Sequence, residues 1–192
     1  MSHGRRGVGR PEVTTHEDIE LAAFRLFAEH GFEGTTLDMI AAEVGVGRRT
    51  LFRYFPSKND IAWGRFDATL DHFRSLLAAL PDDLDPNEAV LRGVLAFNDF
   101  SPGGPIDHRD RMRLILYTPA LQAHSVLRYG DWRQVIADFV AVRTGEPAGS
   151  IGPQLVSHLA LARALCAYEQ WLAAGDAELL EILRVVLFRS HA

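Results

Sequence analysis

The sequence is poor in cysteine and has no long hydrophobic run. Its one cysteine, Cys166, excludes an intrachain disulfide and suits a reducing compartment. The longest uninterrupted apolar runs, Leu76–Leu80 and Ala164–Tyr168, contain five residues each, whereas a membrane-spanning helix needs about 20. The N-terminal segment is basic, but no apolar stretch follows it, so no secretion signal is expected. These absences predict a soluble cytoplasmic protein that has no membrane partner.

An excess of positive charge is also missing, because the 192 residues include 20 Lys and Arg against 25 Asp and Glu. The basic residues are nevertheless clustered. Residues 1–11 hold three Arg, and residues 45–58 hold three Arg and one Lys, with no acidic residue in either segment. Residues 12–43, between them, hold eight acidic residues and one Arg. A nucleic-acid partner needs a local basic patch of this kind, and an acidic remainder limits binding to other polyanions.

Alternating β-branched residues, which predict strands, are absent as well. Apolar residues recur at intervals of three and four, which predicts an all-α protein of about nine helices, two of them very short. Thr15 followed by Asp18 has the pattern of a capping box, which begins the first of these helices. One long helix is expected from Ser57 to about Leu80. Another, over Ala120–Thr144, is expected to be kinked or broken near Ser125.

Two short predicted helices between residues 36 and 55 are joined by Gly45-Val46-Gly47. This spacing is typical of a helix-turn-helix, in which glycine permits a tight turn and an apolar residue fills the angle between the helices. On the second helix, at about 100° per residue, Leu51 and Phe55 share the inward face. The opposite face carries Arg48, Arg49 and Arg53, with Phe52 at its border. Such a helix fits a major groove, where Arg is the commonest reader of guanine, although a solvated, arginine-rich face on a linker helix is the alternative.

One longer motif extends over residues 34–58: Gly34-Thr35-Thr36-Leu37-x-x-Ile40-Ala41-x-x-x-Gly45-Val46-x-x-x-Thr50-Leu51-Phe52-x-Tyr54-Phe55-Pro56-Ser57-Lys58. It resembles the DNA-binding signature of the TetR family of one-component regulators, and Ala23-x-x-Leu26-Phe27-x-x-x-Gly31-Phe32 resembles the helix that precedes it there. The resemblance covers residues 15–62. It implies an N-terminal three-helix helix-turn-helix DNA-binding domain and a C-terminal helical domain for ligand binding and dimerisation. We accordingly expect a basic flexible arm over residues 1–14, the DNA-binding domain over 15–60, and the effector-binding and dimerisation domain over 61–192.

The family's pattern assigns roles to individual residues of this motif. It implies base-facing positions at Arg48, Arg49, Thr50, Phe52 and Arg53, and phosphate contacts from Thr36, Tyr54 and Lys58. The arm residues Arg5, Arg6 and Arg10 would follow a phosphate strand or enter a minor groove, unless the arm is a basic tail without a role. Two positions depart from the family, since Gly47 stands where a capping Ser or Thr is frequent and Phe52 replaces a frequent Tyr. A less firmly started recognition helix and a purely apolar base contact follow from these departures.

The last two predicted helices, over about residues 153–174 and 178–189, carry more apolar surface than one buried face needs. A single helix-turn-helix makes too little DNA contact for tight binding, so such proteins usually bind as dimers to two half-sites about 34–36 Å apart. The resemblance implies a homodimer on a palindromic operator, with a four-helix interface built from these helices. The residues expected there are Leu155, Leu159, Ala162, Cys166, Leu179, Leu183 and Val186. The alternative is that these helices form the core of a monomer.

The middle of the chain is rich in aromatic residues and holds polar residues inside apolar helices. Buried polar groups need partners, and a ligand is one such partner. The residues expected to line an effector pocket are Phe66, Phe97, Asn98, Arg109, Arg113, Tyr117, Gln122, His124, Trp132, Tyr168 and Trp171. An apolar cavity with Arg at its mouth suits an amphipathic anion such as a fatty acid or an acyl-coenzyme A (acyl-CoA) thioester, a recurring effector class of the family. The alternatives are an ordinary aromatic core and a solvated, arginine-rich helix start.

A second motif reads Arg111-Met112-Arg113-Leu114-Ile115-Leu116-Tyr117-Thr118-Pro119-Ala120-Leu121-Gln122-Ala123-His124-Ser125 and continues as Arg128-Tyr129-x-x-Trp132-Arg133. It resembles the regulators encoded beside biosynthesis genes for mycofactocin, a peptide-derived redox cofactor. Together the two resemblances imply a sequence-specific DNA-binding transcriptional regulator, a repressor by family default. Its effector would tilt the helix Ser57–Leu80, change the separation of the recognition helices and release the DNA.

An enzymatic function is poorly supported by the sequence. The eight histidines show no H-x-x-x-H or E-x-x-H pairing, so neither a zinc nor a di-iron helical site is expected. We expect no catalytic residue, no metal and no cofactor. Cys166 has no basic neighbour in the sequence and is interpreted as a packing residue. The remaining alternative is an all-helical dimeric ligand-binding or interaction protein without specific DNA binding.

Overall fold

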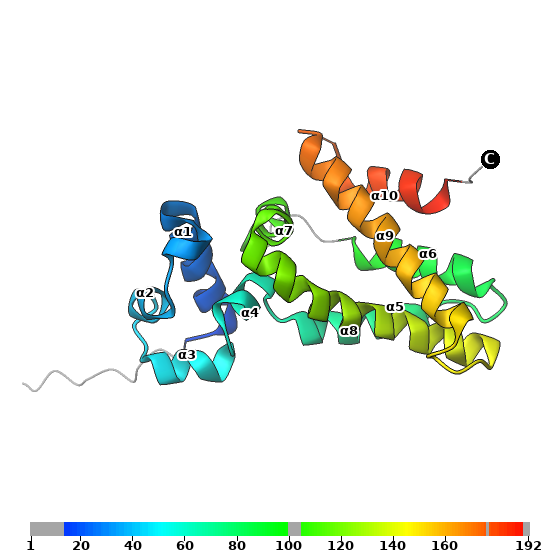
Figure 1. Cartoon of the computed structure of the whole chain (residues 1–192), viewed down its shortest axis with the longest axis horizontal. Helices are drawn as coiled ribbons and strands as arrows, with labels where there is room; N and C mark the ends of the chain where they lie inside the picture. The colour runs from blue at the N-terminus through cyan, green and yellow to red at the C-terminus, as the bar shows by residue number, and fades with distance from the viewer. Residues whose placement is uncertain (1–13, 100–104, 176, 190–192) are drawn as a thin grey trace, which may run out of the picture. The chain divides into compact units, whose positions relative to one another are not determined.

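A computed structural model gives the structure of the chain and describes residues 14–99, 105–175 and 177–189. Within these ranges the chain forms ten α-helices and no strand, which confirms the predicted all-α fold (Figure 1). The helices are α1 (His16–Gly34), α2 (Leu37–Glu43), α3 (Arg48–Tyr54), α4 (Lys58–Trp63), α5 (Phe66–Ala78), α6 (Pro86–Phe97), α7 (His108–Tyr117), α8 (Pro119–Thr144), α9 (Ile151–Ala173) and α10 (Leu179–Phe188). The chain divides into two compact units, residues 1–61 and 62–192. Arg5, Arg6 and Arg10 of the predicted arm lie outside the described residues.

The first unit begins with the capping box that the sequence predicts. The Thr15 hydroxyl accepts a hydrogen bond from Asp18 N (3.1 Å), and the Asp18 carboxylate accepts one from Thr15 N (2.8 Å). At Gly31 the backbone adopts a left-handed conformation (φ +72°), which kinks α1 near its end. The small core of this unit consists of Ile19, Ala22, Ala23, Leu26, Phe27, Phe32, Ile40, Ala41, Leu51, Phe55 and Ile61. The three helices of the helix-turn-helix domain therefore share one apolar centre.

The structure divides in two the helix that the sequence predicts from Ser57 to Leu80. Helix α4 ends at Trp63 and α5 begins at Phe66. Gly64, between them, has φ +63°, a left-handed conformation that interrupts the i→i−4 hydrogen bonds of an α-helix. An isolated glycine inside an apolar periodic pattern does not by itself show whether the helix continues, and for this reason the sequence predicts one helix too few. The boundary between the two compact units falls within α4.

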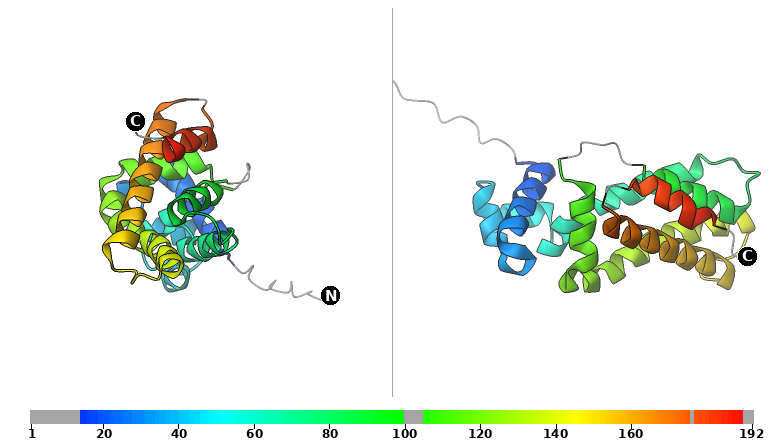
Figure 2. Two further views of the ribbon diagram at one scale, coloured as in Figure 1. Left: turned by 90° about the vertical axis from the view of Figure 1, so that its right-hand side faces the viewer. Right: turned by 90° about the horizontal axis from the view of Figure 1, so that it is seen from above.

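The second unit packs α5, α6, α8, α9 and α10 around one hydrophobic core. Near its centre Phe73 stacks on Trp132, with ring centroids 5.3 Å apart and planes at 18°. Helix α7 adds the partly buried Met112 and Leu116 at the edge of this core. Helices α9 and α10 lie side by side (Figure 2). None of the described helices combines the length and the apolar character needed to cross a membrane.

Helix α8 is continuous, without the break that the sequence predicts near Ser125. The Ser125 hydroxyl donates to Leu121 O (2.7 Å), one turn earlier in the same helix. A serine that bonds back to its own helix in this way satisfies its polar group without ending the helix. Pro119 begins the helix, at a position whose N–H has no helical partner in any case.

Candidate functional site

The face of α3 that the sequence predicts to read DNA is exposed. Arg48, Arg49, Phe52 and Arg53 are exposed and Thr50 is half-buried. On the opposite side of the helix, Leu51 and Phe55 are buried in the core of the first unit. Because α3 has only seven residues, these two anchors fix which face turns outward. The structure therefore places the predicted arginines together on a solvent-facing surface.

The three arginines of this face differ in their surroundings. Arg48 forms an ion pair with Asp38 of α2 (3.3 Å), and its guanidinium stands 5.6 Å from the centroid of the Phe52 ring. Arg49 and Arg53 form no ion pair with any residue in the described part of the chain. An exposed ion pair contributes only about 0–1 kcal/mol, so a phosphate or base can replace Asp38 at little cost. Two of the three guanidiniums are thus without an ion pair in the described part of the chain, and the third has an internal partner.

The turn before α3 has the geometry that a helix-turn-helix requires. Gly45 takes a left-handed conformation (φ +69°), and Val46 N donates to Ala41 O (2.9 Å). Gly47 occupies the N-cap of α3 and offers no side-chain hydrogen bond. Its carbonyl instead accepts from Thr50 N (2.8 Å) and from the next residue (3.1 Å). The recognition helix thus begins on backbone hydrogen bonds alone.

Two of the residues predicted to hold phosphates are engaged inside the first unit. The Tyr54 hydroxyl donates to Thr14 O (2.6 Å). The Lys58 ammonium donates to Phe32 O (2.6 Å) and Thr35 O (2.8 Å), at the carbonyl-rich end of α1. A lysine at a helix C-terminus satisfies carbonyls that lack helical partners, and Lys58 retains one N–H beyond these two bonds. Phosphate contacts from Lys58 and Tyr54 stay predictions.

Thr36 keeps the position that the prediction requires. It is exposed, and its hydroxyl oxygen accepts from Met39 N (3.2 Å) as the N-cap of α2. A hydroxyl that accepts one hydrogen bond can still donate another. Its proton is therefore able to reach a phosphate oxygen outside the unit.

Several of the aromatic residues predicted to line an effector pocket pack against one another. Phe73, which was not among them, contacts both Trp132 and Phe97, with centroids 5.3 and 4.6 Å away, and the centroids of those two rings are 6.5 Å apart. Four of the predicted aromatics are buried in the core of the second unit: Phe66, Trp132, Tyr168 and Trp171. Tyr117, Gln122 and Arg113 are exposed, and His124 is half-buried. Their role as the lining of an effector pocket stays a prediction.

The predicted pocket residue Arg109 caps a helix. Its guanidinium donates to Trp171 O (2.7 Å), Ala174 O (3.3 Å) and Ala177 O (3.1 Å), and lies 4.3 Å from the centroid of the Trp171 ring. These carbonyls follow the C-terminal end of α9, where a cation is favourable. Arg113 pairs with Asp110 at the surface (3.6 Å). Arg109 is thus held by backbone carbonyls and Arg113 by an acidic neighbour, and their place at the mouth of an effector cavity stays a prediction.

Asn98 and Tyr168 belong to a buried chain of hydrogen bonds that also includes His108. Asn98 Nδ2 donates to Val94 O (2.7 Å), and the Tyr168 hydroxyl donates to Asn98 Oδ1 (2.5 Å). Because Tyr168 gives its one proton to Asn98, His108 must donate from Nε2, which lies 2.9 Å from the phenol oxygen. Burial, with a smaller contribution from Arg111, lowers the pKa of His108 to about 4, so the ring is neutral at pH 7. The chain ties the end of α6 and the start of α7 to α9, and no sequence pattern marks His108 for this role.

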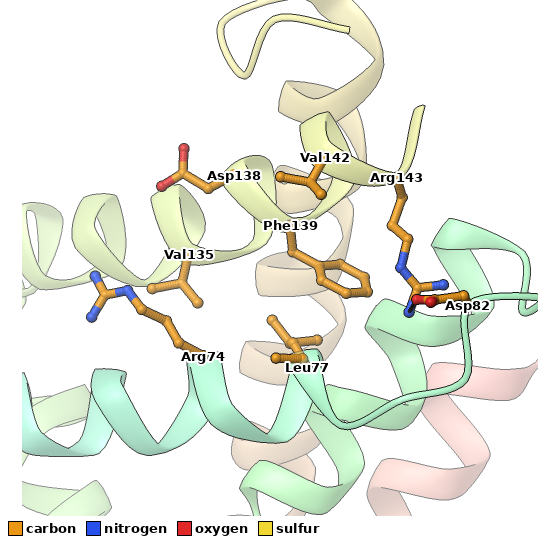
Figure 3. Close-up of a pocket in the computed structure, with 9 residues that line it drawn as sticks. Arg74, Leu77, Asp82, Val135, Asp138, Phe139, Val142 and Arg143 are labelled. Atoms are coloured by element: carbon orange, nitrogen blue, oxygen red, sulfur yellow. Dashed lines mark ion pairs between the residues drawn. The ribbon is translucent and has the colours of Figure 1, made fainter. Parts of the chain in front are cut away.

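A groove that the sequence does not predict lies between α5 and α8. It has a volume of about 430 Å³, within the range of roughly 300–1,000 Å³ that small-molecule sites occupy. Its lining residues are Arg74, Leu77, Ala78, Asp82, Val135, Asp138, Phe139, Val142 and Arg143. Figure 3 shows an apolar middle around Leu77 and Phe139 and, at one end, the ion pair between Arg143 and Asp82 (3.4 Å). Arg143 also donates to the carbonyls of residues 80 and 81, so its main role is to hold the loop after α5.

The predicted dimer interface is only partly at the surface. On α9, Leu155 and Leu159 are 54% and 49% exposed, and Ala162 and Cys166 are also exposed. On α10, Leu179 and Leu183 are buried in the core of the single chain, and Val186 is half-buried. Helix α10 turns the face formed by residues 179, 183 and 187 inward, because these positions recur every four residues. Leu179 and Leu183 are therefore core residues, and the exposed apolar side chains of α10 are Val185 and Phe188.

Comparisons with known proteins agree with this geometry. Residues 20–62 match the family described as bacterial regulatory proteins, tetR family, and residues 84–189 match the MftR C-terminal domain. The chain is 45% identical over 183 residues to a Mycobacterium tuberculosis protein assigned provisionally as the mycofactocin biosynthesis transcriptional regulator MftR. That match covers 95% of this chain and 92% of the relative. The HTH-type transcriptional regulator TcmR of Streptomyces glaucescens is 30% identical over 137 residues, which cover 68% of this chain and 61% of that protein.

A solved structure shares the fold. SmeT, the repressor of the Stenotrophomonas maltophilia multidrug efflux pump SmeDEF, is similar with a TM-score of 0.60 at 20% identity, over 91% of this chain and 87% of that one. The helix-turn-helix, its exposed arginine face and these matches define the class of protein, a DNA-binding transcriptional regulator. The chain belongs to the TetR family, and its second unit carries the MftR C-terminal domain.

Proposed function

We propose that the protein is a repressor that binds a palindromic operator as a homodimer. The observation that carries the proposal is the exposed face of α3, on which Arg49 and Arg53 have no ion-pair partner among the described residues. A guanidinium in this position can donate two hydrogen bonds to O6 and N7 of guanine in the major groove. The second copy of the face would enter the next major groove, about 34–36 Å away.

The exposed apolar side chains of α9 support the dimer. Ile151, Leu155 and Leu159 recur at intervals of four along the helix and are all exposed in the single chain. A row of this kind is unusual on a monomer and marks a protein–protein contact. The double substitution Leu155→Glu with Leu159→Glu should convert the dimer to a monomer, measured by light scattering after size-exclusion chromatography. The same variant should lose most of its operator affinity.

A salt titration on the DNA upstream of the protein's own gene tests operator binding. A scrambled duplex of equal length serves as the control. Specific binding by a dimer predicts a clear preference for the native duplex and a steep loss of affinity with salt, because each phosphate contact releases counterions. Equal affinity for both duplexes, followed by failure to select any preferred site from a genomic library, would contradict the proposal.

We further propose that a small-molecule effector, of the acyl-CoA or a related amphipathic-anion class, releases the operator. The resemblance to the family supports an effector, and the assignment of the M. tuberculosis relative supports mycofactocin biosynthesis genes as the target. An effector can release DNA only if it binds the released form more tightly. Palmitoyl-CoA added to the operator complex should therefore raise the operator Kd, and deletion of the gene should raise transcripts of the mycofactocin genes. An unchanged operator Kd at saturating thioester would contradict this part of the proposal.

A further inference from the structure

Buried polar side chains of the second unit generally have hydrogen-bond partners. Asn98, Tyr168 and Ser125, for example, donate hydrogen bonds of 2.7, 2.5 and 2.7 Å. The indole N–H of Trp63 and the hydroxyl of Tyr129 are different, because both atoms are buried and neither makes a hydrogen bond of ordinary geometry within the described ranges. The Ser125 hydroxyl lies close enough to lower the pKa of Tyr129, although burial outweighs this effect. Leaving a buried donor without a partner is costly, so a water or a ligand is expected to supply the acceptor.

The two side chains meet where α4 ends. Their ring centroids are 5.6 Å apart with planes at 75°, and Trp63 also meets the ring of Phe66 edge-on at 4.9 Å. Both residues are half-buried as whole side chains, although their polar atoms are covered. The pair therefore lies at the edge of the core, apart from the closely packed stack of Phe73 and Trp132.

The polar groups of Trp63 and Tyr129 are suited to bind a hydrogen-bond acceptor. The indole of Trp63 can only donate a hydrogen bond. Burial raises the pKa of Tyr129, so its phenol keeps its proton at neutral pH. Two guanidiniums belong to the same neighbourhood, and each has a partner: Arg128 lies over the ring of Phe66, 5.6 Å from its centroid, and pairs with Asp67 (3.7 Å), while Arg111 donates to a backbone carbonyl of α4 (2.8 Å). The carboxylate of Glu169 also acts on Tyr129 and raises its pKa. Two donors in these surroundings suit an oxygen that carries lone pairs.

We infer that Trp63 and Tyr129 together hold a carbonyl or carboxylate oxygen of the effector. This inference rests on the proposed effector response and names the polar group by which the effector is recognised. Trp63 is the last residue of α4, a helix of six residues. At the other end of α4, Lys58 donates to Phe32 O and Thr35 O in the first unit. A ligand that moves Trp63 thus acts on a short helix whose opposite end is fixed to the DNA-binding unit.

Three ligands of equal chain length test the inference on the intact protein. Palmitoyl-CoA carries a thioester oxygen, S-hexadecyl-CoA lacks it, and palmitate carries a carboxylate instead. Calorimetry should give the wild type a Kd for palmitoyl-CoA about ten-fold or more below that for S-hexadecyl-CoA, since hydrogen bonds to one oxygen are lost. In Tyr129→Phe and in Trp63→Phe this preference should fall to about three-fold or less. Palmitate identifies the source of the oxygen: tighter binding than palmitoyl-CoA assigns it to a free acid, and weaker binding to a thioester.

A ligand-free measurement provides a matched control between two tyrosines. Tyr129→Phe removes a hydroxyl that makes no hydrogen bond of ordinary geometry and should leave Tm unchanged or raise it by ~2–4 °C. Tyr168→Phe removes a hydroxyl that is bonded on two sides, so it should lower Tm while keeping the preference for the thioester. A wild type that binds the thioester and the thioether equally, or a Tyr129→Phe variant that keeps the full preference, would overturn the inference. Operator binding is measured separately, so failure of the proposed repressor function would appear there and not in the ligand preference.

Discussion

The two units of the chain are organised over different distances along the sequence. In the DNA-binding unit the decisive features are local, such as the capping box of Thr15 and Asp18 and the left-handed Gly45 before the recognition helix. In the second unit, Arg109 bonds to a residue 68 positions away and Tyr168 to one 70 positions away. The role of a residue can be predicted from the sequence when it depends on neighbours within a few positions. Roles set by distant partners become visible only when the chain is folded.

The largest effect is expected at Leu183, which the sequence predicts to lie in a dimer interface and which the structure places in the core of the single chain. Leu183→Ala should lower the free energy of unfolding by about 2–5 kcal/mol, since it removes a fully buried side chain. Val185→Ala, two residues along the same helix and 61% exposed, is the control and should change it by less than about 0.5 kcal/mol. Denaturant unfolding at several protein concentrations measures both. A loss at Leu183 that disappears at high concentration would return this residue to the interface.

The buried chain through His108 predicts how the second unit responds to pH. The pKa of His108 is lowered to about 4 in the folded protein from an ordinary value of 6.5, so the unfolded chain binds the proton first as the pH falls. Stability from this group is therefore complete above about pH 6.5 and declines toward pH 4, by up to about 3 kcal/mol. His108→Gln keeps a donor for Tyr168 but cannot titrate, and its unfolding should lose this part of the pH dependence. Identical pH profiles for the wild type and the variant would show that the ring is solvated in the folded state.

Substitutions on the exposed face of α3 are expected to change operator affinity and to leave the free energy of unfolding unchanged. Arg49→Ala should weaken operator binding by about 1–3 kcal/mol and relax the sequence preference at one position of each half-site. Arg25→Ala is the control, because Arg25 is exposed in the same unit, belongs to α1 and pairs with Glu43 of α2 (3.1 Å). Gel-shift titrations on the operator and on a scrambled duplex measure both variants. Equal losses for the two substitutions would mean that only the total charge matters.

In both units, the outcome of the sequence predictions follows the distance along the chain to each residue's partners. The helix-turn-helix, its turn and the outward face of α3 could be predicted, because glycine conformation and helical periodicity act within a few residues. Lys58 and Arg109 could be recognised as basic residues near important elements, but the carbonyls that they bind lie 23 to 68 positions away. No sequence pattern marks Trp63 or Tyr129, because whether a buried donor has a partner depends on which residues the folded chain places around it. Sequence reasoning thus finds the exposed face of α3 and misses the hydrogen bonds between residues far apart in the chain.

The smallest expected effect is a change in operator affinity caused by Asp38, the ion-pair partner of Arg48 on the exposed face of α3. Asp38 holds Arg48 at 3.3 Å, and both side chains are more than half exposed. Asp38→Asn should strengthen operator binding by about two- to five-fold at low salt, because DNA no longer competes with an internal carboxylate for Arg48. Asp71→Asn, which frees Arg74 in the second unit, makes the same change in net charge and should have a smaller effect. If operator affinity rises equally in the two variants, the change in net charge explains the result. If it rises only in Asp38→Asn, the ion pair with Asp38 restrains Arg48 in the free protein. The sequence did not predict this ion pair, although it lies within the DNA-binding unit.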